Sequence, residues 1–302
     1  MEGPRATRSA PFGWGGLILR LSLFFGVLAA LVWGAGTLGV AAFLGGALTL
    51  LLASVAAGVL VLRLDGRRPG ALGFPLALSL PRELGRGVGL GLALGLAVTG
   101  LIALGGGIAL GSEPGTPLGW LGAAWGSFAF FALPAAAEEA LARGYAFQVL
   151  AARLGGWPAL ALTSVAFSAL HLGNPDVAPL ALVNLAAAGA LLGLVYLRTL
   201  SLWWASGVHL GWNWSIGFWV DLPVSGLDLV DAPYLALRMD GPAWWSGGAF
   251  GPEGGIAALV VLTGAAVWIA RTRWLAPEPS AVQWRPLPDP LQPGHPREGS
   301  EY

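Results

Sequence analysis

The sequence predicts an all-α fold, a polytopic bundle of about eight transmembrane helices, and three observations support this prediction. The 302 residues are 56% hydrophobic and only 11% charged, whereas soluble domains carry about 25% charged residues. The apolar residues run in blocks of about 20, the length that crosses a bilayer core as a helix. Within these blocks apolar and polar residues do not alternate, as they would in the strands of a membrane barrel.

Eight apolar stretches are the candidate spans. In chain order they cover residues 17–33, 38–62, 87–110, 118–137, 157–171, 180–197, 202–220 and 255–270. The fourth helix can continue as far as Arg153, with a bend at Pro134, because proline removes a backbone hydrogen bond from a helix. Small residues four positions apart in the third and sixth stretches favour close helix packing; they are Gly87, Gly91, Gly95, Gly189 and Gly193.

These spans divide the chain into three parts. Residues 1–16 are a basic N-terminal tail, and residues 17–274 are the transmembrane domain, whose motifs fall within 119–220. Residues 275–302 are rich in proline and polar residues without periodicity, which predicts a disordered cytoplasmic tail.

The arginines predict the orientation of the bundle. All 16 basic residues are arginine, and with eight spans and an inner N-terminus only Arg238 falls in an outer loop. The positive-inside rule therefore predicts that both termini lie inside. The outer loops carry acidic residues, namely Glu113, Asp176, Asp221, Asp228, Asp231, Asp240 and Glu253.

Composition also excludes several classes of function. A net charge of zero gives no basic surface for nucleic acid. The chain has no cysteine, which excludes disulfides, thiolate metal sites and a cysteine nucleophile. The tryptophans at 203, 204, 212, 214 and 219 are expected to face lipid or its interface.

The fourth apolar stretch runs into three charged side chains, Glu138, Glu139 and Arg143. An ionised group in hydrocarbon costs from about 3 to over 10 kcal/mol, so such residues are functional-site candidates. In a helix Glu139 and Arg143 stand four apart and can form an ion pair. Glu138 points about 100° away and can face a cavity. One carboxylate is thus held ionised while its neighbour is free to handle protons.

Two histidines complete a polar set within the apolar stretches. His171 ends the fifth stretch, and His209 lies on the seventh with Asn213 four residues later, on the same helical face. A desolvated glutamate can take a proton from water, and histidine and asparagine can donate hydrogen bonds to an oxyanion. The alternatives are a zinc ion held by Glu138, His171 and His209, or interhelical hydrogen bonds without catalysis.

The order of these motifs resembles the CPBP family, which groups CAAX prenyl endopeptidases with bacteriocin-processing and self-immunity membrane proteins. The resemblance rests on EExxxR at 138–143, FxxxH at 167–171 and HxxxN at 209–213, and covers about a third of the chain. It implies an intramembrane endopeptidase whose substrate is a membrane-associated peptide, CAAX-type prenylated or bacteriocin-like. It also implies an integral protein of a prokaryotic cell membrane.

The resemblance further implies a role for each polar residue. Glu138 is expected to activate water, with His171 holding the water or a zinc ion. Glu139 pairs with Arg143 and braces Glu138, while His209 and Asn213 form the oxyanion pocket. The family is described both as metalloprotease and as metal-free glutamate protease, and the sequence does not decide between them.

Two other functions stay open at this stage. One is a non-catalytic immunity or scaffold protein of the same fold, and the other is a proton-coupled transporter, which an inverted repeat would favour. One geometric question also stays open. Counting depth along straight helices places Glu138 near the inner face and His171 near the outer end of its span. They meet only if the fifth helix is short and the turn at 173–179 dips into the bundle.

Overall fold

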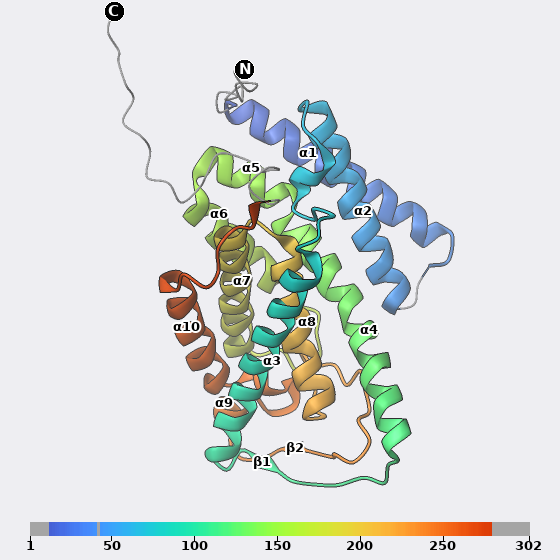
Figure 1. The fold of residues 1–302 in the computed structure, drawn as a ribbon, viewed down its shortest axis with the longest axis vertical. Coiled ribbons are helices and arrows are strands. Elements are labelled where there is room, and N and C mark those ends of the chain that lie inside the picture. Colours follow the sequence, from blue (N-terminus) through green and yellow to red (C-terminus); the bar gives the residue numbers. More distant parts are fainter. Residues whose placement is uncertain (1–11, 41–42, 280–302) are drawn as a thin grey trace, which may run out of the picture.

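The protein is a bundle of helices, seen here in a computed structural model that describes residues 12–40 and 43–279 (Figure 1). The predicted all-α bundle is confirmed. Its α-helices are α1 Trp14–Thr37, α2 Phe43–Leu64, α3 Leu80–Leu104, α4 Pro117–Arg143, α5 Tyr145–Leu154, α6 Gly156–Ala169, α7 Pro179–Thr199, α8 Leu202–Trp214, α9 Ala243–Ser246 and α10 Ile256–Arg271. Most of both predicted tails, residues 1–11 and 280–302, lies outside the described residues.

Short elements connect these helices. The two-residue strands β1 Ile108–Ala109 and β2 Arg238–Met239 pair antiparallel, at the end of the bundle opposite η1. Helical turns occur at η1 Pro69–Leu72, η2 Ser215–Trp219, η3 Gly248–Phe250 and η4 Pro252–Gly254, and η2 is a π-helical turn that extends α8.

Each of the eight predicted stretches is largely helical, but not every helix is long enough for a full span. Among the residues that the structure describes, five helical segments are long and apolar enough to cross a membrane: α1, α2, α3, α4 continued by α5, and α7. The helices α6, α8 and α10 have only 14, 13 and 16 residues, against about 20 for a full span. The protein is thus an integral membrane protein in which three of the predicted stretches form helices shorter than a full span.

The fourth helix continues through the acidic motif toward Arg153, as predicted, with one break between α4 and α5. Pro134 lies inside α4 without ending it, and the break comes at Gly144, between α4 and α5. A Cβ atom on Gly144 would lie 2.1 Å from the carbonyl oxygen of Ala140, closer than any side chain tolerates. The glycine after Arg143 therefore lets the chain turn directly below the acidic motif.

Helices α3 and α8 pack with their backbones in close contact, and glycines on both sides make this possible. A Cβ atom on Gly91 would lie 2.0 Å from the carbonyl oxygen of Val208, and one on Gly211 would lie 2.2 Å from that of Val88. The predicted packing role of the small residues in the third stretch is confirmed. This contact fixes α8, which carries His209.

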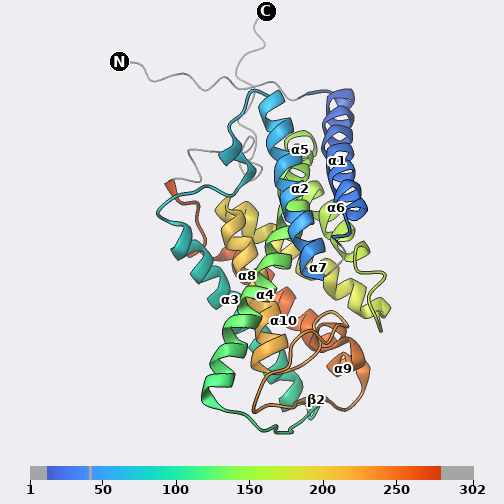
Figure 2. The ribbon, with the colours of Figure 1, turned by 90° about the vertical axis from the view of Figure 1, so that its right-hand side faces the viewer.

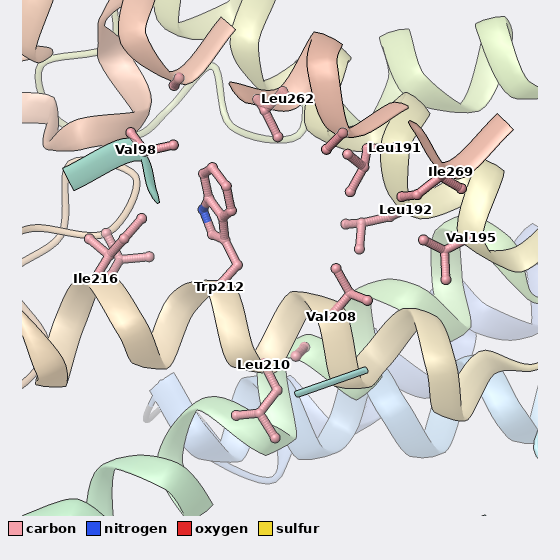
Figure 3. Close-up of a cluster of buried hydrophobic side chains, with 14 of the residues drawn as sticks. Val98, Leu191, Leu192, Val195, Val208, Leu210, Trp212, Ile216, Leu262 and Ile269 are labelled. Carbon is pink, nitrogen blue, oxygen red and sulfur yellow. The ribbon is translucent and has the colours of Figure 1, made fainter. Parts of the chain in front are cut away.

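The central core is built around α8 and includes side chains of α3, α7 and α10. Figure 3 shows Val208 and Trp212 on one side of this helix, toward Leu262 of α10 and Leu192 of α7, while Leu210 points the opposite way. Trp212 and Trp204 are buried. The expectation that both face lipid is therefore wrong, because one face of α8 is enclosed by α7 and α10.

The segment between η2 and α10 folds back under the bundle. Figures 1 and 2 show that β2 and α9 lie at the end of the molecule where α3 finishes and α4 begins. Val224 and Leu222 of this segment are buried in the central core. The longest predicted outer loop is thus a packed part of the structure that can reach the polar motifs.

Candidate active site

The polar centre of the site is a buried network around Glu139. Its side chain is fully buried, and Oε1 accepts a hydrogen bond from Nη1 of Arg143 at 2.8 Å. The same oxygen lies 3.0 Å from Nδ1 of His209, which comes from α8. Because an ionised carboxylate only accepts hydrogen bonds, Nδ1 of His209 carries the proton in this contact. The predicted pair of Glu139 and Arg143 is present, and His209 is an additional partner.

Arg143 connects this network to two further helices. Its Nη2 donates to the carbonyl oxygen of Gly189 on α7 at 2.7 Å, and its guanidinium lies 4.6 Å from the ring centre of Phe167 on α6. The side chain is fully buried. Arg143 is therefore not an inner-loop charge, as the orientation argument assumed, because its charge is paired inside the bundle.

Glu138 points away from this network and toward two imidazoles. Its Oε2 atom lies 3.8 Å from Nε2 of His209 and 3.9 Å from Nε2 of His171. Both separations exceed the usual 2.7–3.2 Å of a hydrogen bond. Within the described residues, this buried oxygen has no hydrogen-bond partner. One water-sized group between the three side chains would satisfy it.

The backbone and a neighbouring ring orient His171. Its Nδ1 lies 2.8 Å from the carbonyl oxygen of Phe167, so that this nitrogen carries the proton and Nε2 presents a lone pair toward Glu138. The phenyl ring of Phe167 lies 4.9 Å from the imidazole of His171 and 6.0 Å from that of His209. The FxxxH spacing thus supplies both an anchor and an apolar partner for the histidine.

The question of depth is answered by the length of α6. This helix ends at Ala169, and His171 lies in the turn that follows it. The fifth helix is thus short, which was the condition for Glu138 and His171 to meet. The turn that follows it brings His171 to the depth of Glu138.

These side chains open into one cavity of about 380 Å³. Glu138, His171, His209 and Asn213 all line it, while most of its remaining wall is apolar and comes from α2, α4, α6, α7, α8 and α10. Glu139 and Arg143 lie behind His209. All six predicted residues therefore belong to the cavity or to the network that supports it.

The predicted zinc site fits this arrangement poorly. A tetrahedral zinc ion with bonds of about 2.1 Å holds its ligand atoms about 3.4 Å apart. The two distances from Glu138 to the imidazoles are about half an ångström longer. In the described part of the chain, no three histidine, aspartate or glutamate side chains form a group that could hold a metal ion. Zinc stays a prediction that metal analysis and chelator sensitivity can test.

Sequence reasoning missed a second buried glutamate in the cavity wall. Glu253 was expected in an outer loop, but it is only 7% exposed. Its Oε1 accepts from Nε1 of Trp212 at 2.7 Å, and its Oε2 accepts from the hydroxyl of Ser225 at 2.7 Å. Asn174 also lines the cavity and donates to the carbonyl oxygen of Ser225. These contacts join segments far apart in sequence, so no local spacing indicated them.

Comparison with known families supports the assignment suggested by the motifs. Residues 120–215 match the family described as type II CAAX prenyl endopeptidase, Rce1-like. The protein carries an Rce1-like domain. This Rce1-like domain runs from α4 to the first residue of η2 and contains all six predicted site residues, as the CPBP resemblance required. The match supports a membrane protease but not specifically a metalloprotease.

Two further comparisons give no relatives. A search of curated proteins finds no match to the chain, and a search of solved structures finds none either. The function is therefore inferred from the geometry of the site and from the family match of residues 120–215.

Proposed function

We propose that this protein is an intramembrane endopeptidase that hydrolyses a peptide bond of a membrane-associated substrate with water activated by Glu138. The observation that carries the proposal is the buried Oε2 of Glu138, which lies within 4 Å of two imidazole nitrogens and, in the described chain, has no hydrogen-bond partner. A carboxylate that faces a cavity and two imidazoles is the arrangement expected of a general base.

The reaction begins with a water molecule between Glu138 and the two imidazoles. Glu138 takes one proton from this water, and Nε2 of His171 accepts a hydrogen bond from its other O–H group. The water oxygen attacks the carbonyl carbon of the substrate and forms a tetrahedral intermediate. The low polarity of the surrounding walls strengthens each of these contacts relative to water.

The negative charge that develops on the substrate oxygen in the tetrahedral intermediate needs hydrogen-bond donors. Asn213 lines the same cavity and can donate from its amide group. His209 can donate from Nε2 when it is an imidazolium, whose positive charge Glu139 stabilises from the Nδ1 side. Arg143 pairs with Glu139 from the other side and keeps it in this position. The proton that Glu138 took from the water then passes to the leaving nitrogen as the C–N bond breaks, which restores the carboxylate.

The family match and the cavity walls support a proposal for the class of substrate. We propose a peptide anchored in the bilayer, either CAAX-type prenylated or bacteriocin-like, because the cavity walls are mostly apolar and the domain is Rce1-like. The prokaryotic cell membrane is the proposed location. An apolar segment of the substrate would fill the cavity, with the scissile bond beside Glu138.

A cleavage assay with a matched control tests the proposal. The purified protein in liposomes is incubated with prenylated CAAX peptides and with unprenylated apolar peptides, and mass spectrometry locates the cut. We expect the wild type to cleave at an internal bond and Glu138→Gln to lose at least about 100-fold in kcat, the lower range for a general base. Glu83→Gln, which alters a buried carboxylate bound to Ser201 outside the cavity, should keep its activity.

The same assay separates the proposal from the non-catalytic alternative. An immunity or scaffold protein of this fold would cleave neither peptide, and Glu138→Gln would leave its function unchanged. Activity of Glu138→Gln equal to that of Glu83→Gln would contradict the proposed role of Glu138.

A further inference from the structure

A tight hairpin closes one side of the cavity. Val224 and Leu227 exchange two backbone hydrogen bonds of 2.9 Å, and the two residues between them both have positive φ, 51° at Ser225 and 81° at Gly226. This is the two-residue hairpin turn in which both central residues are left-handed. Because Ser225 has a Cβ atom, this left-handed conformation costs free energy, and contacts with neighbouring groups must hold the residue there.

The tip of the hairpin lies against the turn that carries His171. The side-chain amide of Asn174 donates to the carbonyl oxygen of Ser225 at 2.8 Å. A Cβ atom on Gly226 would lie 2.2 Å from the carbonyl oxygen of Pro175, which shows how closely the two turns approach. The amide of Gly226 also donates to the carbonyl oxygen of Phe250. The position of the turn after α6 is therefore coupled to that of the hairpin.

Glu253 holds the hairpin and α8 at the same time. Its Oε2 accepts from both the backbone amide and the hydroxyl of Ser225, and its Oε1 accepts from the indole nitrogen of Trp212. Trp212 lies three residues after His209, on the same face of α8. All three donors are neutral and the acceptor is a carboxylate, which makes these hydrogen bonds stronger than neutral ones.

We propose that Glu253 is a positioning residue that sets the separation of the two histidines around Glu138. Through Ser225 and Asn174 it fixes the turn of His171, and through Trp212 it fixes the face of α8 that carries His209. This inference rests on the proposed peptidase function and adds a residue outside its three motifs. A displacement of about 1 Å in a catalytic group can lower the rate about 100-fold.

The variant Glu253→Gln tests this role. Whichever way the new amide group turns, its NH₂ faces either the two donors of Ser225 or the indole N–H of Trp212, so one of the two links is lost. Because Glu138, His171 and His209 then no longer keep their spacing, we expect kcat to fall about 10- to 100-fold while KM changes less than about threefold. Glu83→Gln is the matched control, a buried carboxylate bound to a serine hydroxyl away from the cavity.

Hydrogen exchange gives a second readout that does not need activity. In Glu253→Gln we expect faster amide exchange in residues 170–178 and 222–230 when the Ser225 link is lost, or in residues 208–214 of α8 when the Trp212 link is lost, with the rest of the bundle unchanged. Unchanged exchange in all three segments would overturn the proposal, and so would faster exchange spread over the whole bundle, since that is what a merely structural residue gives.

The two readouts distinguish failure of this inference from failure of the proposed function. If the wild type cleaves and Glu253→Gln keeps its kcat, the positioning role is wrong while the peptidase stands. If the wild type does not cleave any peptide, the proposed function fails. Hydrogen exchange in Glu253→Gln alone then decides whether Glu253 positions the segments that it contacts.

Discussion

At the scale of single residues, two adjacent glutamates have different environments. Glu139 is fully buried between Arg143 and His209, whereas Glu138 faces the cavity. The sequence predicted this division, because consecutive helical residues point about 100° apart and residues four apart can pair. It could not predict that His209 joins Glu139, since the two are 70 positions apart.

The buried ion pair predicts a large effect of Arg143→Ala on stability. The substitution leaves the carboxylate of Glu139 in the apolar interior without its cation, and breaking a buried pair in this way costs about 3–5 kcal/mol. We expect a lower thermal midpoint in detergent. Arg82→Ala is the control, because Arg82 pairs with Glu278 at the surface, where such pairs contribute at most about 1 kcal/mol. Equal shifts for the two variants would mean that His209 alone supports Glu139.

At the scale of elements, the site depends on one short helix and on one break in a long helix. Hydropathy predicted the eight helical stretches, the fifth of them short, and α6 ends at Ala169 so that His171 lies in the turn near Glu138. Hydropathy did not predict the break at Gly144 after α4, because a single glycine hardly changes the hydropathy of the stretch around it.

The glycine contact between α3 and α8 gives a prediction at this scale. In Gly91→Ala the new methyl group would lie 2.0 Å from the carbonyl oxygen of Val208, so the helices must separate, at a cost of about 1–3 kcal/mol. Gly89→Ala, on the same helix, meets nothing within 4 Å and should stabilise by up to about 1 kcal/mol. Thermal unfolding of both variants measures the difference. A midpoint of Gly91→Ala equal to that of Gly89→Ala would contradict the close packing.

At the scale of the whole molecule, the polar side chains at the cavity come from four parts of the chain. Three of them, α4, the turn after α6, and α8, carry recognisable motifs, which is why their convergence could be predicted. The fourth, from the hairpin at 224–227 to Glu253, carries no such motif, and its sequence predicted an outer loop. Its contacts depend on the closed fold, because Glu253 reaches Ser225 and Trp212 across 28 and 41 positions.

The central claim is that Glu138 and the histidines act together on one water, and a double-mutant cycle tests it most directly. The rates of peptide cleavage by Glu138→Gln, His171→Ala and the double variant are compared with the wild type. Residues that act as a unit are strongly non-additive, so we predict that the double variant is no slower than Glu138→Gln by more than about threefold. If the losses in cleavage rate of the two single variants multiply in the double variant, Glu138 and His171 do not act together on one water. A Glu138→Gln variant as active as the wild type would contradict the same claim.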